Sequence, residues 1–234
     1  EICHSIILHT AGGMVGGDRL SQTINLQPET HVLLTTPAAS KIYRSSGETA
    51  QNHINIEVHE QAYLEFIPRE NIIFNGAIFS QKIRVDLAES AGYLGWEITR
   101  FGRTARGEVF NQGQWKSCTE IWQNGCPIWI DRQGFIASAE ILNSPHSLGG
   151  QPVIASLIWV GQPVSEDMIK SIRQLWEQRE TSSQAGVTQL ISGLLCRYRG
   201  NSTQEVIEWF MDVWQLFRQN YTGKSIVKPR VWQL

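Results

Sequence analysis

Short runs of alternating apolar and polar residues, spaced roughly ten residues apart, dominate the chain from residue 2 to about residue 161. The clearest run is HINIEVHE (53–60), in which apolar residues occupy every second position. Successive side chains of a strand point to opposite faces, so this period is that of a half-buried strand. KIRVDLAE (82–89) repeats the pattern, and glycine, proline, asparagine and serine separate the runs. The spacing predicts a mainly β chain with an antiparallel-rich sandwich, barrel or other stacked, sandwich-like architecture.

Two α-helices are predicted in the C-terminal third. The first covers SEDMIKSIRQLWEQRE (165–180), where Ser165 is a candidate N-cap followed by two acidic residues. The second begins at NSTQE (201–205), where Ser202 and Glu205 have the spacing of a capping box. The apolar stripe of the second helix is broad, so this helix is either deeply buried or in contact with another protein. The stripe comprises Val206, Phe210, Val213, Trp214, Phe217 and Tyr221, with Ile207 and Trp209 beside it.

Extended structure is predicted around these helices. FIASAEIL (135–142) has strand-type composition, and GVTQLISGLLCRYRG (186–200) is interpreted as a strand with a candidate bulge at Gly193. The tail KSIVKPRVWQL (224–234) is expected to be extended, because Pro229 disfavours a third helix.

Length and charge limit the classes of function. The 234 residues suit one large β domain, and we treat 1–234 as a single domain. The chain starts at Glu1 without methionine and runs directly into an apparent strand, so we expect upstream strands to be missing. A net charge of -2 gives no electrostatic basis for binding nucleic acid or an anionic membrane, and no apolar run reaches the roughly 18 residues of a membrane span. Four scattered cysteines fit reduced thiols in the cytoplasm.

The stretch HTAGGMVGGDRL (9–20) resembles a phosphate-binding loop only superficially. A dinucleotide fingerprint needs glycine where Met14 stands, and a P-loop needs lysine after its last glycine. Gly17 is followed by Asp18 and Arg19, which puts a carboxylate where phosphate would bind. Nucleotide binding is therefore disfavoured. The stretch is either a wide turn with glycines at positive φ or a turn that lets backbone or an ion pass near Asp18.

The carboxylates Glu65, Glu70, Glu97, Glu108 and Glu120 are the remaining candidates for chemistry. In alternating strands these side chains face either solvent or the interior, and both orientations stay open. In the interior they would need partners or water, because an unpaired buried charge is costly. A row of such groups would form a hydrated polar passage. A pair of them could instead serve glycoside hydrolysis, although the sequence supplies no separation between carboxylates.

Several blocks, spread over the whole chain in the right order, resemble the UreD (UreH) family of urease accessory proteins. Each block alone is modest, and together they are highly specific. Members of this family carry further strands before the glycine motif, which agrees with the expectation of missing upstream strands. The blocks are GGMVGGDRL (12–20), TTPAASKIYRS (35–45), LEFIPRENIIF (64–74), WEITRFGRTARGEVF (96–110), GVTQLI (186–191) and KPRVWQL (228–234).

The resemblance implies a β-rich maturation chaperone and no enzyme. UreD-like proteins bind the accessory proteins UreF and UreG and the urease apoprotein. This complex inserts nickel into the urease active site, with GTP hydrolysis supplied by UreG. The resemblance implies no permanently bound cofactor, only transient Ni²⁺ that passes through a water-filled internal tunnel. The nucleotide would then belong to a partner, which explains the absence of a phosphate cradle.

A conduit should bind nickel weakly. Carboxylates and water suit a hydrated ion in transit, whereas a set of cysteine and histidine ligands would trap it. We therefore place Asp18, Glu65 and Glu97 on the expected nickel passage, with Glu70 and Glu108 behind them.

The expected partner surface is the second helix, with Trp209, Phe210 and Trp214, together with the tail through Trp232. Two other classes of function stay open. One is an all-β carbohydrate hydrolase that uses paired glutamates. The other is a module that bridges urease and its GTPase without touching metal.

Overall fold

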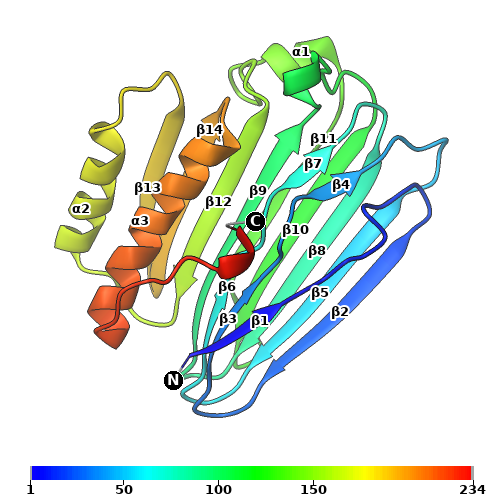
Figure 1. Cartoon of the computed structure of the whole chain (residues 1–234). Coiled ribbons are helices and arrows are strands. Elements are labelled where there is room, and N and C mark those ends of the chain that lie inside the picture. The colour runs from blue at the N-terminus through cyan, green and yellow to red at the C-terminus, as the bar shows by residue number, and fades with distance from the viewer. Residues whose placement is uncertain (1, 233–234) are drawn as a thin grey trace.

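Two β-sheets lie face to face, and two helices lie against the outer side of one of them (Figure 1). The computed structural model describes residues 2–232. The nine-stranded sheet, here the helix-covered sheet, contains in spatial order β1 (Cys3–Ile6), β3 (His31–Thr35), β6 (Tyr63–Phe66), β9 (Gly92–Phe101), β12 (Val153–Val160), β14 (Gly193–Gly200) and β13 (Gln184–Leu190), with β7 (Asn71–Ile73) paired to β9 and β4 (Ser40–Ile42) to β7. The five-stranded sheet, here the open sheet, contains β11 (Cys126–Ile136), β10 (Gln114–Gln123), β8 (Ile78–Leu87), β5 (Ala50–Val58) and β2 (Arg19–Leu26).

The prediction of a mainly β, stacked architecture is confirmed, but the expected antiparallel-rich pairing is wrong. Parallel ladders join β2, β5, β8 and β10 in the open sheet and β1, β3, β6 and β9 in the helix-covered sheet. From β1 to β10 the chain crosses repeatedly between the sheets, so parallel neighbours of the open sheet (β2, β5, β8 and β10) are separated along the chain by at least one strand of the helix-covered sheet. That intervening strand replaces the helix that usually connects parallel neighbours, which brings consecutive strands of one sheet into the same direction.

The inner faces of the two sheets are apolar at both ends of the strands. Ile56 and Val85 belong to a buried cluster near one end, which also contains Tyr93 of β9. Phe79 and Phe101 belong to a second cluster at the other end. The alternation read from the sequence therefore packs one face of each strand against the opposite sheet.

Both predicted helices are present with the predicted N-cap serines, but the reciprocal half of the capping box does not form, because the Ser202 amide and the Glu205 carboxylate both bond to Tyr198 Oη. α2 (Glu166–Glu177) begins after Ser165, whose Oγ accepts a hydrogen bond from the Met168 amide at 3.2 Å. α3 (Thr203–Thr222) begins after Ser202, whose Oγ accepts from the Glu205 amide at 3.2 Å. These bonds satisfy amide groups that have no partner within the helix. Among the described residues, no helix is both long and apolar enough to span a membrane.

Two local predictions are wrong. A third, short helix, α1 (Ala139–Asn143), occupies part of the segment expected to be a strand, and Ser138 Oγ caps it by accepting from the Ile141 amide. Gly193 does not form a bulge, because it starts β14 after the tight turn that joins this strand to β13. Short 3₁₀ turns also occur as η1 (Thr104–Arg106) and η2 (Arg230–Trp232).

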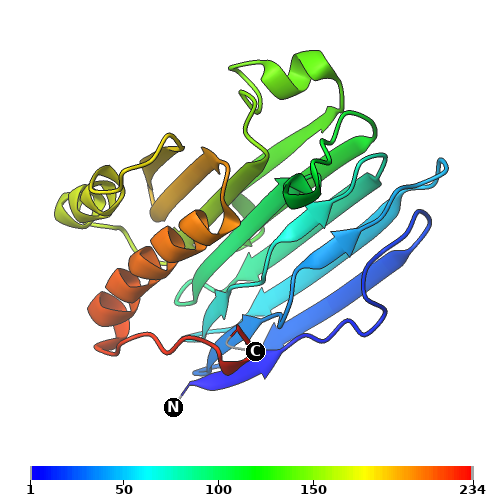
Figure 2. The same cartoon turned by 45° about the horizontal axis from the view of Figure 1, so that its top comes forward.

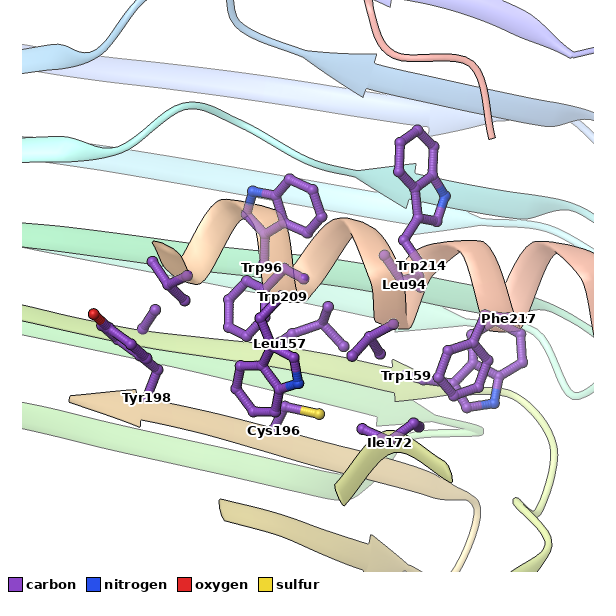
Figure 3. Packing of buried hydrophobic residues seen from close by; sticks show 14 of the residues in the cluster. Leu94, Trp96, Leu157, Trp159, Ile172, Cys196, Tyr198, Trp209, Trp214 and Phe217 are labelled. Atoms are coloured by element: carbon purple, nitrogen blue, oxygen red, sulfur yellow. The ribbon is translucent and has the colours of Figure 1, made fainter. Parts of the chain in front are cut away.

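Aromatic residues fill the space between the helix-covered sheet and its helices. Trp96 and Trp159 project from β9 and β12 toward Trp209, Trp214 and Phe217 of α3 (Figure 3). The side chains of Trp209, Trp214 and Phe217 are fully buried. Burial on more than one side explains the broad apolar stripe of α3 without a partner protein.

Candidate functional site

Two rows of polar side chains meet inside the sandwich, between its two apolar ends. Each row follows the strand register, so neighbouring strands place their polar residues side by side. We call this set the polar seam. It comprises Asn52, Gln81, Ser117 and Gln133 from the open sheet and Glu97, Ser156 and Arg197 from the helix-covered sheet.

Glu97 is the carboxylate of the polar seam. Its Oε2 accepts hydrogen bonds from Gln81 Nε2 at 2.7 Å and from Ser117 Oγ at 2.9 Å. Its Oε1 accepts from Thr119 Oγ1. All three donors are neutral groups of the open sheet, and their hydrogen bonds cross the interior and hold the carboxylate in place. None of the three donors carries a positive charge that could pair with the carboxylate.

A chain of amides continues from Gln81 toward the edge of the open sheet. Gln81 Oε1 accepts from Asn52 Nδ2 at 3.2 Å and from Asn71 Nδ2 at 3.3 Å. Asn52 Oδ1 in turn accepts from Gln22 Nε2 at 3.2 Å. The chain of amides thus links the carboxylate of Glu97 to the strand β2 at the sheet edge.

Open space accompanies the polar seam. A cavity of about 400 Å³ is lined by Glu97 and Gln81 and also by Gly13 and Lys41. Beyond Glu97, a hole of about 20 Å³ is bordered by Ser156, which also borders a groove of about 290 Å³. The hole has room for about one water molecule. The cavity and the hole share Glu97, and the hole and the groove share Ser156, so the three spaces follow one another across the sandwich.

Burial raises the pKa of Glu97, and the hydrogen bonds from Thr119, Ser117 and Gln81 offset this only in part. The raised pKa means that the ionised form lacks the solvation it would have in water. A cation that reached this carboxylate would therefore replace a missing favourable interaction.

An ion pair lies at the far end of the polar seam. Arg197 of β14 is 2.9 Å from Asp131 of β11, and it also donates to Ser156 Oγ at 3.2 Å. Gln133 Nε2 donates to the other carboxylate oxygen of Asp131 at 2.6 Å. These contacts join the two sheets where the 290 Å³ groove begins.

The glycine stretch forms a turn packed against β4, as the first of the two interpretations predicts. The Met14 amide donates to the Lys41 carbonyl oxygen at 2.8 Å. A Cβ on Gly13, which has φ +150°, would stand 2.5 Å from that same oxygen. Asp18 accepts from the Val15 amide at 2.8 Å and so closes the turn. Asp18 is not among the residues that line the cavity.

Glu65 lies apart from the polar seam, on the helix side of its sheet. It forms a fully buried ion pair with Arg218 of α3, whose Nε is 2.7 Å from Glu65 Oε1. Trp214 Nε1 donates to the same oxygen at 2.8 Å, and His31 Nε2 lies 3.4 Å from Oε2. Burial alone would raise the pKa of Glu65, but Arg218, His31 and Trp214 hold it below its ordinary value.

The other predicted carboxylates also have arginine neighbours. Glu70, at the end of the β6–β7 connection, is 3.4 Å from Arg69 Nε. Glu108 binds Arg103 with two hydrogen bonds and also accepts from the Asn75 amide at 3.1 Å. The Arg103 hydrogen bonds are the main reason that the pKa of Glu108 is lowered. The structure therefore does not bring the five predicted metal residues together, and it places only Glu97 in the polar seam.

The residues predicted for partner binding lie largely in the interior. Trp209, Phe210 and Trp214 are 0% exposed, so the structure places them in the core and not on a partner surface. Trp232 is partly buried, and its Nε1 donates to Thr35 Oγ1 and to the Thr36 carbonyl oxygen, both at 3.1 Å. The tail is thereby attached to the outer side of the helix-covered sheet.

Gln81, Asn52 and Ser117 were absent from the candidates drawn from the sequence. The sequence does carry a sign of such residues, which is a polar residue at a strand position where the alternation predicts an apolar, inward-facing one. Gln81 is an example, because it lies between the inward-facing Phe79 and Ile83. Such an interruption costs free energy unless hydrogen bonds compensate it, so it marks a polar interior.

Within residues 2–232, no group of three or more histidine, cysteine, aspartate or glutamate side chains converges in a way that could hold a metal ion. The four cysteines are free, and only Cys196 is buried. Apart from Asp131, which is paired with Arg197, the polar seam offers the carboxylate of Glu97 with amide and hydroxyl oxygens, a donor set of the kind that binds cations weakly.

A family model described as UreD urease accessory protein matches residues 1–233. A protein of Nostoc punctiforme is 55% identical over 234 residues, which is 100% of this chain and 83% of that protein. One of Microcystis aeruginosa is 47% identical over 99% of this chain and 84% of its own length, and one of Synechocystis is 41% identical over 92% and 80%. All three are named urease accessory protein UreD.

Proposed function

This chain belongs to the UreD urease accessory protein family and so has a role in urease maturation, and we propose that it performs this role by passing Ni²⁺ along the polar seam toward the urease apoprotein. In this proposal the chain acts in the cytoplasm, in a complex with UreF and the GTPase UreG. It contributes a path for the ion and leaves nucleotide hydrolysis to UreG.

The observation that carries the proposal is the environment of Glu97. Glu65, Glu108 and Glu120 each lie within salt-bridge distance of an arginine, whereas within residues 2–232 no lysine, arginine or histidine lies that close to Glu97. Glu97 also borders both the 400 Å³ cavity and the small hole beyond it. Glu97 is therefore a carboxyl group at the wall of an open space, with no cationic side chain of its own among the described residues.

The neighbours of Glu97 suit an ion in transit. Gln81, Asn52 and Ser117 present amide and hydroxyl groups, which can replace water around a divalent cation one ligand at a time. The raised pKa of Glu97 couples cation binding to proton release. An arriving cation would favour the ionised carboxylate, so the carboxyl group would lose its proton as the cation binds. A weak site of this kind would release nickel as readily as it takes it up.

The test is nickel loading of urease in cells that express the complete maturation set with Glu97→Gln in this chain. Glutamine keeps the size and the hydrogen-bonding oxygen but removes the charge. We expect copurification with UreF and urease to be unchanged and the nickel content of urease to fall several-fold. Glu177→Gln, at the exposed C-terminal end of α2, is the matched control and should leave loading unchanged.

A second variant tests whether nickel loading needs the open space beyond Glu97, while the carboxylate is kept. Ser156→Phe should fill the hole beyond Glu97 and lower loading while the carboxylate remains. Normal nickel content in both Glu97→Gln and Ser156→Phe, with assembly intact, would refute the conduit. The chain would then act as a bridge that does not touch metal.

A further inference from the structure

Within residues 2–232, no helix covers the outer face of the open sheet. α2 and α3 pack on the other sheet, and Figure 2 shows them on the side away from β2 and β5. On this face His53, Lys82 and Arg132 are exposed. A bare five-stranded face of this kind is either solvated surface or an interface, and its residues decide between the two.

Cations occupy adjacent register rows on this face. His53, Lys82, Cys118 and Arg132 stand side by side on β5, β8, β10 and β11. Lys116 stands in the next row, beside Ser80 and Gly134. Within residues 2–232, neither Lys82 nor Lys116 has an acidic group within 4.0 Å, although the Lys82 charge helps to lower the pKa of Glu120; neither lysine is held in an ion pair, so both can contact a partner.

An ordered aromatic and arginine cluster adjoins these cations. The Arg84 guanidinium lies 4.0 Å from the centre of the Trp122 ring and binds Asp86 through hydrogen bonds of 2.8 and 2.6 Å. Trp122 Nε1 is 3.4 Å from Glu120, a carboxylate only 9% exposed that also lies 3.4 Å from Arg132.

This cluster holds its side chains in one arrangement. Tryptophan and arginine dominate the binding energy of protein interfaces, and groups ordered in advance lose less entropy on binding. Ile130 pairs with Glu120 in register and is 37% exposed, so it adds apolar area on this face two positions along β10 from Trp122. The arrangement has the composition of an interface centre.

We propose that the outer face of the open sheet, from β5 to β11, is a docking surface for a protein partner that presents acidic side chains to Lys82, Lys116 and Arg132 and apolar side chains to Trp122 and Ile130. The choice of probes rests on the proposed function, in which this chain works inside a urease-maturation complex.

The charge pattern fits a protein better than a lipid or nucleic acid surface. Glu57 and Asp86 stand side by side in register one row beyond Arg84. A uniformly anionic surface would meet these carboxylates as well as the cations. A partner protein can instead place opposite charges row by row, which steers association and fixes orientation.

The test compares charge reversal on this face with reversal elsewhere. Lys82→Glu/Lys116→Glu changes the proposed surface, and Lys170→Glu/Lys224→Glu changes two exposed lysines of α2 and the tail. Urease apoprotein and UreF are the two probes, each measured at low and high salt against the full chain. We expect the first variant to weaken one of these complexes at least tenfold at low salt and to abolish its salt dependence, with less than a twofold effect from the control.

Two further measurements locate the contact. Trp122→Ala should weaken the same complex about tenfold or more, as expected for an interface anchor. Hydrogen exchange of the complex should show protection in β8, β10 and β11. Melting temperatures close to that of the unchanged chain would exclude misfolding, because these lysines are exposed.

The outcomes separate the two proposals. Unchanged affinity of the Lys82→Glu/Lys116→Glu variant for both probes, or protection confined to the helix-covered sheet, would overturn the docking surface alone. Failure of the unchanged chain to bind either probe would overturn the docking surface together with the proposed complex.

Discussion

Breaking the ion pair between Glu65 and Arg218 should separate a structural role from a role in nickel transport. Both side chains are buried, and the pair joins β6 to α3 across the aromatic core. Glu65→Leu leaves the Arg218 charge in the interior, where its remaining acceptor is the Ser225 carbonyl oxygen at 3.5 Å. Trp214 Nε1 loses its acceptor in the same variant.

The expected loss follows from these uncompensated groups. Removing one partner of a buried ion pair costs about 3–5 kcal/mol of unfolding free energy. For a chain of this size about 2–4 °C accompanies each kcal/mol, so the melting temperature should fall by about 6 to 20 °C. The double variant Glu65→Leu/Arg218→Met removes both charges and leaves mainly the indole unpaired. Its loss should be about 1–3 kcal/mol, smaller than that of the single variant.

Urea denaturation followed by tryptophan fluorescence and circular dichroism measures these losses, and nickel loading of urease measures function. The reasoning requires the double variant to be more stable than Glu65→Leu and to support loading once it is folded. A loss below about 1 kcal/mol in Glu65→Leu, or equal losses in the single and double variants, would refute the coupling. A stable double variant that fails to load urease would indicate that Glu65 takes part in nickel transport.

Three further predictions concern the interior, the turn and the tail. Because the pKa of Glu97 is raised in the folded chain, the contribution of this group to stability should be lost as the pH rises above about 4.3 and through the folded pKa, so the stability of the unchanged chain relative to Glu97→Gln should fall over this range in profiles from pH 4 to 8. Gly13→Ala should lower the melting temperature more than Gly12→Ala, since a Cβ on Gly13 would meet the Lys41 oxygen at 2.5 Å, whereas a Cβ on Gly12 has nothing within 4 Å. Trp232→Ala should expose the tail to limited proteolysis without unfolding the core, because its indole holds the tail at Thr35; unchanged cleavage would contradict that anchor.

The helix caps were readable in the sequence because their interactions are local. Ser165 and Ser202 bond to amides three positions along the chain, so the sequence carries both partners within one turn. The strand pattern was equally local, and it predicted which residues of β5 and β8 face inward. The α1 segment was misread because five helical residues are too short to impose a helical period.

Side-chain partners were not readable, because they come from distant strands. Glu65 and Glu97 have similar apolar neighbours in the sequence, yet Glu65 meets Arg218, 153 positions away, whereas Glu97 meets neutral donors from β8 and β10. One carboxylate is thereby paired with a cation, and the other has only neutral hydrogen-bond donors around it. That difference selects Glu97 from the five predicted metal residues.

The sequence by itself determined the β character, the inward face of the strands, the two capped helices and the family, because each depends on residue types at short spacing or on motif order. Only the tertiary structure decided the parallel pairing, since a period of two residues marks a strand without naming its neighbour. It also decided which polar residues meet inside the sandwich, because register aligns Asn52, Gln81 and Ser117 from strands far apart in the chain.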